Sequence, residues 1–132
     1  AFTGDTLFSG GCGRVFEGTM EQMYHSLNVK IGKLPGDTQL FFGHEYTENN
    51  LRFAQTLEPK NEDIQSQLTQ IQRVRSEGKW STPSLLASER KINPFLRCHD
   101  QTLQKHVIQK QHDTNLDPIS IFTVIRKLKD QF

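Results

Sequence analysis

Cysteine is scarce in this sequence, because Cys12 and Cys98 are the only two among 132 residues. Two cysteines give no disulfide framework, so a reducing compartment is the simpler expectation, and Cys98 is expected to be a packing residue. No run approaches the roughly 18 apolar residues that a membrane-spanning helix needs, and no signal-peptide pattern stands at the start. We therefore expect a soluble, intracellular protein that has no membrane partner.

A dense basic stripe is also missing. The net charge is +1, with 8 Lys and Arg against 11 Asp and Glu in residues 1–89, and 8 against 4 in residues 90–132. A nucleic-acid-binding protein would show a denser basic stripe with interleaved aromatic residues. The basic tail therefore favours a small anion over a nucleic acid as its partner.

The sequence has no methionine at its start, and "AFTGDTLF" begins as though already inside a strand. The length suits one ordinary domain, or a small domain plus part of another. We find no internal repeat and no low-complexity tract. The chain is therefore expected to be a fragment that begins within a larger domain.

The first 58 residues have a β-α-β pattern. "AFTGD", residues 1–5, and "QLFFG", residues 39–43, are predicted strands, and a glycine-rich loop covers residues 9–18. Thr19 and Gln22 have the spacing of a capping box, which predicts a helix start. Apolar residues follow at helical spacing and are expected in the core: Met20, Met23, Leu27, Ile31 and Leu34.

The rest of the chain is predicted to be all-helical. Helices are expected over residues 47–57, after the cap residue Asn61, over residues 100–110, and from Asp117 with Pro118 at its first position. The stretch that contains Pro83 and Pro94 is expected to be irregular. The fold class is therefore mixed α/β (α+β), with the strands in the first part of the chain.

Asp5 and His44 are the two residues with the clearest chemical potential. Each follows a short predicted strand and stands beside a glycine, Gly4 or Gly43. Strand ends collect binding groups, because the sheet holds them rigidly while the loops leave them open to substrate. A carboxylate and an imidazole brought together are typical ligands of a hydrolytic metal. The alternative is a capped aspartate and an ordinary polar histidine, and spacing alone leaves both open.

The segments "FTGDTLFSGGCGRVFEG" and "FFGHEYTENNLRFA" together resemble the second half of the metallo-β-lactamase fold in glyoxalase II, the hydroxyacylglutathione hydrolases. The downstream "PSLL", "NPFLR" and "KDQF" resemble the helical C-terminal domain of that family, so the resemblance covers nearly the whole chain. It implies that residues 1–58 are the C-terminal part of an αββα sandwich. Residues 59–132 would form a small all-helical domain.

The resemblance also implies an activity, the hydrolysis of the thiolester S-D-lactoylglutathione to D-lactate and glutathione. Two divalent metal ions would take part, with zinc favoured and iron or manganese open. Asp5 would bridge the two ions and His44 would bind the second, which makes both residues catalytic as well as metal-binding. Metal coordination lowers the pKa of water from 15.7 to about 7, so hydroxide would be present at neutral pH.

The glutathione part of that substrate is anionic and needs cations and hydrogen-bond donors. By resemblance, the substrate-binding residues are Arg14, Val15, Phe16, His44, Glu45, Tyr46, Arg126 and Lys129, with Val15 and Phe16 acting through their backbone. Arg126 and Lys129 are three residues apart and so share a helix face, and we expect the apolar stripe of that helix to point the other way. The ordinary alternative for each cation is a solvated surface charge.

Two departures from the family pattern matter. Many members have tyrosine where this chain has Phe16, so a phenolic hydrogen bond would be absent. The family's H-x-H-x-D-H cluster and a further upstream histidine are not in this sequence. The other four histidines have no such spacing and are not expected to be ligands: His25, His99, His106 and His112.

These departures leave three interpretations open. The leading one is that the chain is part of an enzyme whose complete form is a monomer. In this interpretation the chain alone is inactive and prone to associate through exposed sheet edges. The rivals are a non-catalytic glutathione-binding or interaction module and a paralogue with altered chemistry. A cytoplasmic location is expected, with the mitochondrial matrix as the alternative.

Overall fold

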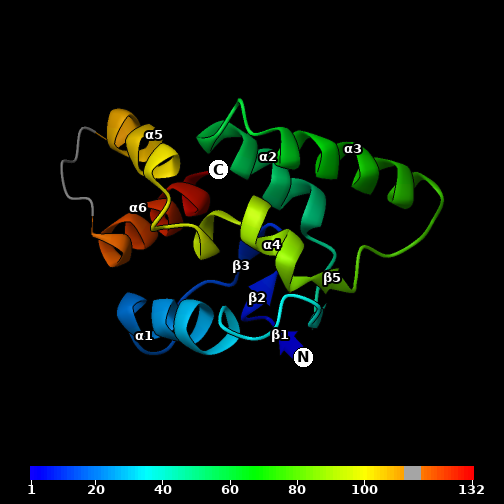
Figure 1. Cartoon of the computed structure of the whole chain (residues 1–132), viewed down its shortest axis with the longest axis horizontal. Helices are drawn as coiled ribbons and strands as arrows, with labels where there is room; N and C mark the ends of the chain where they lie inside the picture. Colours follow the sequence, from blue (N-terminus) through cyan, green and yellow to red (C-terminus); the bar gives the residue numbers. More distant parts are fainter. Residues whose placement is uncertain (112–116) are drawn as a thin grey trace.

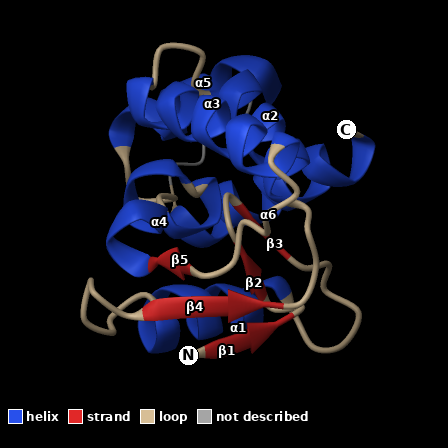
Figure 2. Ribbon diagram, turned by 90° about the vertical axis from the view of Figure 1, so that its right-hand side faces the viewer, coloured by secondary structure: helices blue, strands red, loops and turns tan. Residues whose placement is uncertain are grey.

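The computed structural model describes residues 1–111 and 117–132, and the expectation for His112 lies outside the described residues. The described residues form a mixed α+β fold, as the sequence predicts. Figure 1 follows the chain from its N-terminal strands to its C-terminal helix. In the view of Figure 2 the small sheet lies at the bottom and most of the helices lie above it. No helix in the described part of the chain is both long and apolar enough to cross a membrane.

A three-stranded sheet joins the two parts of the chain. Strand β1 (Phe2–Gly4) pairs in parallel with β4 (Gln39–Phe42), which confirms both predicted strands. Strand β5 (Ser84–Leu85) pairs antiparallel with the other side of β4. The prediction that everything after residue 58 is helical is therefore wrong. Two residues are too few to show the alternating pattern by which a strand is recognised in sequence.

The glycine-rich segment also contains structure that was expected to be a loop. Strands β2 (Leu7–Phe8) and β3 (Gly11–Cys12) form an antiparallel hairpin that packs beside β1. A side chain at Gly13 would overlap the backbone carbonyl oxygen of Asp5. Glycine is therefore required here, because the hairpin returns directly against the residue that follows β1.

The connection between β1 and β4 contains a helix that starts where the sequence predicts. Thr19 and Gln22 form a complete capping box at the start of α1 (Met20–His25), with hydrogen bonds of 2.9 and 3.1 Å. The helix continues as a π-helix, Ser26–Ile31. Leu34 is 37% exposed, so its prediction as a core residue is wrong. The chain turns after the π-helix, and this turn carries Leu34 off the buried face.

Within residues 1–111 and 117–132, five further α-helices and one short 3-10 helix follow. They are α2 (Thr47–Leu57), α3 (Glu62–Ser76), α4 (Leu86–Ile92), the 3-10 helix Pro94–Leu96, α5 (Gln101–Gln111) and α6 (Pro118–Gln131). The predicted caps are confirmed, because the side chains of Asn61 and Asp117 accept backbone N–H groups at the starts of α3 and α6. Helix α4 was missed, since it has seven residues, no side-chain cap and a buried charged residue, Glu89.

One large hydrophobic core crosses the predicted boundary at residue 58. It unites Leu7 and Leu40 from the strands with Phe95, Phe122 and Ile125 from the second part of the chain, and all five are buried. Burying a side chain of this size contributes roughly 1.5 to 3 kcal/mol. The strands are therefore held against α6, whose side chains also reach the pocket described below. Cys98 is buried in this core, as expected for a packing residue, and the domain boundary itself stays a prediction.

Candidate functional site

Asp5 and His44 meet at one edge of the sheet. Asp5 follows β1 and His44 follows β4, and because these strands are parallel, their carboxyl ends lie at the same edge. The imidazole Nε2 of His44 lies 3.2 Å from Oδ1 of Asp5, and both side chains are exposed. A Cβ at Gly43 would stand 2.6 Å from that carboxylate oxygen, so glycine permits the close approach. The structure brings the pair together, while their role as metal ligands stays a prediction.

Aromatic rings fix the plane of the imidazole. The rings of His44 and Tyr46 stack with centroids 4.8 Å apart and an angle of 7° between their planes. Phe8, on β2, presents its ring to both, at centroid distances of 6.0 and 5.3 Å. The sequence analysis missed Phe8, because an apolar residue in a buried hairpin has no signal that separates it from ordinary core. It forms the floor against which the two site rings rest.

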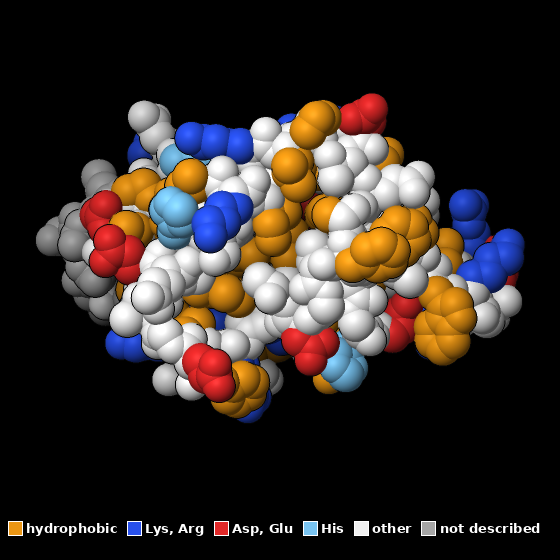
Figure 3. Space-filling view, turned by 90° about the horizontal axis from the view of Figure 1, so that it is seen from below, with side chains coloured by type: hydrophobic (Ala, Val, Ile, Leu, Met, Phe, Trp, Pro, Cys, Tyr) orange, Lys and Arg blue, Asp and Glu red, His pale blue; other side chains and the backbone are white. Residues whose placement is uncertain are grey.

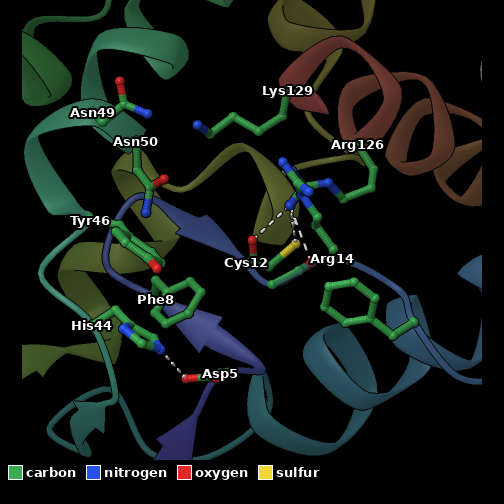
Figure 4. Close-up of a pocket in the computed structure, with 12 residues that line it drawn as sticks. Asp5, Phe8, Cys12, Arg14, His44, Tyr46, Asn49, Asn50, Arg126 and Lys129 are labelled. Atoms are coloured by element: carbon green, nitrogen blue, oxygen red, sulfur yellow. Dashed lines mark hydrogen bonds and ion pairs between the residues drawn. The ribbon is translucent and has the colours of Figure 1, made fainter. Parts of the chain in front are cut away.

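A pocket of about 560 Å³ opens beside this pair. Its lining residues are Asp5, Phe8, Cys12, Gly13, Arg14, Phe16, His44, Tyr46, Asn49, Asn50, Arg126 and Lys129. Figure 4 shows the Asp5–His44 pair at one end and Lys129 and Arg126 toward the other. Seven predicted site residues therefore line one cavity. Asn49 and Asn50, in the first turn of α2, were not predicted.

Arg126 is buried rather than solvated. It is 4% exposed, and its guanidinium donates to the carbonyl oxygens of Cys12 at 2.7 Å and Gly13 at 3.2 Å. A second nitrogen donates to Asp130 at 3.0 Å. The expectation that the packed stripe of α6 points away from Arg126 is therefore wrong, because Arg126 is itself on a packed face. The carbonyl groups at the end of β3 need donors, and Arg126 supplies them from the helix.

Lys129 keeps its ammonium group at the pocket. Its Nζ lies 5.6 Å from the ring centre of Phe53 and 5.4 Å from that of Phe132. Partial burial, reinforced by the positive charges of Arg126 and Arg14, lowers the pKa of Lys129. A cation crowded by other cations gains most from an anionic ligand, since the ligand replaces repulsion with attraction. Lys129 is therefore the pocket cation best prepared to bind an anion.

The segment after β3 contributes an open rim. Arg14 is exposed and lies 3.6 Å from the carboxylate of Asp130 through its Nε. Phe16 is exposed and lines the pocket with its ring, whereas Val15 is not among the lining residues. Any contact from Val15 would have to come from its backbone, which is the role that the resemblance gives it. Arg14 remains free to exchange Asp130 for a ligand carboxylate.

Glu45 does not line the pocket, although it stands between two residues that do. Its carboxylate accepts the backbone N–H of Ser81 at 2.6 Å and the hydroxyl of the same residue. The structure therefore does not bring the Glu45 side chain to the other predicted substrate-binding residues. A contact to substrate would have to come from its backbone.

The donor chemistry of the Asp5–His44 pair fits a divalent metal ion. Carboxylate oxygen and imidazole nitrogen are ligands of zinc, and here they face each other across 3.2 Å. The pair supplies two donors, and residues 1–111 and 117–132 contain no group of three or more His, Cys, Asp or Glu side chains arranged around a common point. Further donors would have to come from outside these residues. The pair therefore offers part of a donor set for a divalent ion, and its role as metal ligand stays a prediction.

Comparison with known proteins identifies the family. Residues 45–132 match the family model described as "Hydroxyacylglutathione hydrolase C-terminus". Over 99% of its length the chain is 45% identical to the hydroxyacylglutathione hydrolase of Psychromonas ingrahamii, 46% to that of Dictyostelium discoideum and 48% to that of Brucella ovis. It covers 51%, 50% and 49% of these proteins, which is about half of their length. The chain belongs to the hydroxyacylglutathione hydrolase family and corresponds to its C-terminal portion, which confirms the resemblance seen in the sequence.

Proposed function

We propose that this chain supplies the C-terminal half of a glyoxalase II-type thiolester hydrolase, which converts S-D-lactoylglutathione and water to D-lactate and glutathione. The observation that carries the proposal is one pocket with the Asp5–His44 pair at one end and the cations Arg14 and Lys129 at the other. Its volume of about 560 Å³ lies in the usual range for small-molecule sites. Membership of the family gives independent support.

The cationic end is suited to the glutathione part of the substrate. Glutathione carries carboxylates, and Lys129 and Arg14 can each donate charge-assisted hydrogen bonds to one of them. The ring of Phe16 offers an apolar wall for the peptide, whereas Tyr46 lies at the other end of the pocket, stacked on His44. Phe16 supplies no phenolic hydroxyl, so this contact is van der Waals only. Lys129, Arg14 and Phe16 would bind and orient the substrate away from the bond that is cleaved.

The other end is suited to the cleavage. Asp5 and His44 would hold divalent metal, with Asp5 bridging two ions, zinc favoured and iron or manganese as alternatives. When bound, such ions lower the pKa of water to about 7 and polarise a carbonyl group. The His44–Tyr46 stack keeps the imidazole nitrogen directed at Asp5. A thiolate is a good leaving group, so no strong general acid is needed among the pocket residues.

We further propose that the parallel β1–β4 pair is part of a larger αββα sandwich. Residues 1–58 would then belong to the metallo-β-lactamase fold and residues 59–132 to a helical domain that carries Lys129. The position of β1 at the edge of the sheet, with no partner strand on its other side within residues 1–111 and 117–132, supports a larger sheet.

A chimeric protein tests the activity. The N-terminal half of the Dictyostelium discoideum relative would be fused to this chain, and hydrolysis of S-D-lactoylglutathione would be followed by the loss of thiolester absorbance. We expect zinc-dependent turnover, and we expect His44→Ala to lose turnover and bound zinc together. Lys129→Met should raise KM with little change in kcat, because it touches only the binding end. A folded, zinc-loaded fusion that leaves this substrate intact would contradict the proposal.

A second candidate is a glutathione-binding module without catalysis. It is favoured by the donor set, since Asp5 and His44 are the two metal-binding groups that converge in the described part of the chain. For the 132-residue chain we expect glutathione binding, seen as NMR shifts of pocket residues, and no thiolester hydrolysis with added zinc. Turnover by the chain alone would exclude this candidate, and loss of glutathione binding would count against both candidates.

A further inference from the structure

Glu45 is a charged residue that the proposed reaction does not use. Its side chain is 18% exposed and turns away from the pocket toward the loop between α3 and β5. One carboxylate oxygen accepts the backbone N–H of Ser81 at 2.6 Å, and the hydroxyl of Ser81 lies 2.9 and 2.8 Å from the two oxygens. Glu45 therefore connects residues 36 positions apart in sequence.

The hydroxyl of Thr47 completes a short relay of hydrogen bonds. It lies 2.6 Å from the hydroxyl of Ser81, and Thr47 is fully buried. Because an ionised carboxylate can only accept, the Ser81 hydroxyl donates to Glu45 and must then accept from Thr47. Ser81 is thus bonded to residues on both sides of Tyr46.

The loop that carries Ser81 is itself held in place. The guanidinium of Arg75, at the end of α3, lies 4.9 Å from the ring centre of Trp80 and donates to the carbonyl of Lys79 at 2.8 Å. Its Nε is 4.0 Å from Glu45 Oε2. Arg75 therefore holds the loop that carries Ser81 and also attracts the carboxylate of Glu45. Ser81 is thus a fixed anchor for Glu45.

The position of Glu45 gives this anchor its importance. Its neighbours along the chain are His44 and Tyr46, whose rings stack on the pocket side. Restraining the middle residue of three restrains the peptide units on both sides, because each residue has only two soft backbone torsions. The direction of the His44 imidazole toward Asp5 therefore depends on a contact outside the pocket.

We propose that Glu45 and Ser81 form a clamp that positions the His44–Tyr46 pair. In this assignment Glu45 is a positioning residue rather than a substrate contact, and Ser81 is a second positioning residue on the loop between α3 and β5. The positioning depends on no ligand, although its importance for zinc binding rests on the proposed function. Outer residues that orient a metal ligand typically contribute 10- to 100-fold to metal affinity.

Ser81→Ala in the 132-residue chain tests the clamp, because it removes the hydroxyl and keeps the backbone donor. We expect displaced NMR signals from the ring protons of His44 and Tyr46, and zinc affinity about 10-fold lower in a competition titration. Ser81→Thr should restore both, since it returns the hydroxyl. Ser66→Ala, at an exposed position of α3, is the matched control and should change neither.

Glutathione affinity separates the clamp from a general loss of structure. The cations that bind glutathione lie at the other end of the pocket, so Ser81→Ala should change this affinity less than twofold. Unchanged ring signals in Ser81→Ala, or no rescue by Ser81→Thr, would overturn the clamp. Should Ser81→Ala unfold, Glu45→Gln applies the same test, because the amide keeps the shape and offers fewer acceptors to Ser81. If wild type bound no zinc, the metal role would fail while the ring signals would still decide the clamp.

Discussion

Replacing Arg126 by methionine should destabilise the fold rather than merely weaken a ligand. Methionine keeps much of the apolar stem but removes the donors to the carbonyl oxygens of Cys12 and Gly13 and to Asp130. Each buried acceptor left without a partner costs about 1 to 3 kcal/mol. Because Asp130 is partly exposed and can be hydrated, the two carbonyl groups dominate. We therefore expect a loss of about 3 kcal/mol in the free energy of unfolding.

Urea denaturation of the 132-residue chain, followed by far-ultraviolet circular dichroism, measures this loss. For a domain of this size the denaturant slope is about 1 to 3 kcal/mol per molar urea, so the midpoint should fall by roughly 1 to 3 M. Lys129→Met is the matched control on the same helix. Its charge is disfavoured by partial burial and by neighbouring cations, so its removal should change stability by less than about 0.5 kcal/mol.

Glutathione affinity should respond in the opposite way to stability, because it should fall more in the Lys129 variant than in an Arg126 variant. Lys129→Met removes a charge-assisted hydrogen bond worth about 1.5 to 3 kcal/mol, which corresponds to about 10- to 150-fold in affinity. Folded Arg126→Lys, which cannot span the same acceptors, should lose stability and retain much of the binding through Lys129. If Arg126→Met were as stable as wild type but lost glutathione as Lys129→Met does, Arg126 would be a direct ligand and the anchor role would be wrong.

Three further predictions concern pH and association. Burial raises the pKa of the Glu89 carboxyl group, which is about 4.5 in the unfolded chain, so the folded state keeps this proton to higher pH. The stability of wild type relative to Glu89→Gln should therefore be greatest below pH 4.5 and should fall as pH rises through the folded pKa. Urea titrations across pH measure this difference. Glutathione affinity should fall as pH rises through the lowered pKa of Lys129, below 10.5, and Lys129→Met should lack that decline in calorimetric titrations. Phe2 is 90% exposed on β1, and the other edge of β1 has no partner strand within residues 1–111 and 117–132. Phe2→Lys should therefore reduce self-association, as measured by light scattering. Equal self-association of wild type and Phe2→Lys would exclude this edge as the contact between copies. Exposed hydrophobic side chains are visible on the face shown in Figure 3.

Local rules predicted the helix starts well. The caps at Thr19, Asn61 and Asp117 depend on side chains within three residues of the groups they bind, so a short window of sequence contains all the information. The meeting of Asp5 and His44 was also accessible, although they are 39 residues apart. Two parallel strands in one sheet must end at the same edge, and each strand was recognisable on its own.

Arg126 shows where such reasoning stops. Helical spacing correctly puts it near Lys129, but spacing does not say which neighbour will cover a position. Its acceptors, Cys12 and Gly13, are more than 110 residues away in sequence, and a backbone carbonyl has no sequence signal at all. The direction of the Glu45 side chain was not predictable for the same reason, because its partner Ser81 lies on a loop with no recognisable motif.

The second part of the chain does more than deliver Lys129 to the pocket. Asn93, at the end of α4, donates to the carbonyl oxygens of Phe8 and Gly11, while Glu89 accepts from Ser9 and Gly10. Together with Arg126 and Ser81, these contacts hold both backbone segments that form the pocket wall. The bonds of Asn93 and Glu89 to the β2–β3 hairpin are buried, so they cannot be exchanged for water without cost. The helices therefore determine the geometry of the Asp5–His44 end although none of them contributes a side chain to that pair.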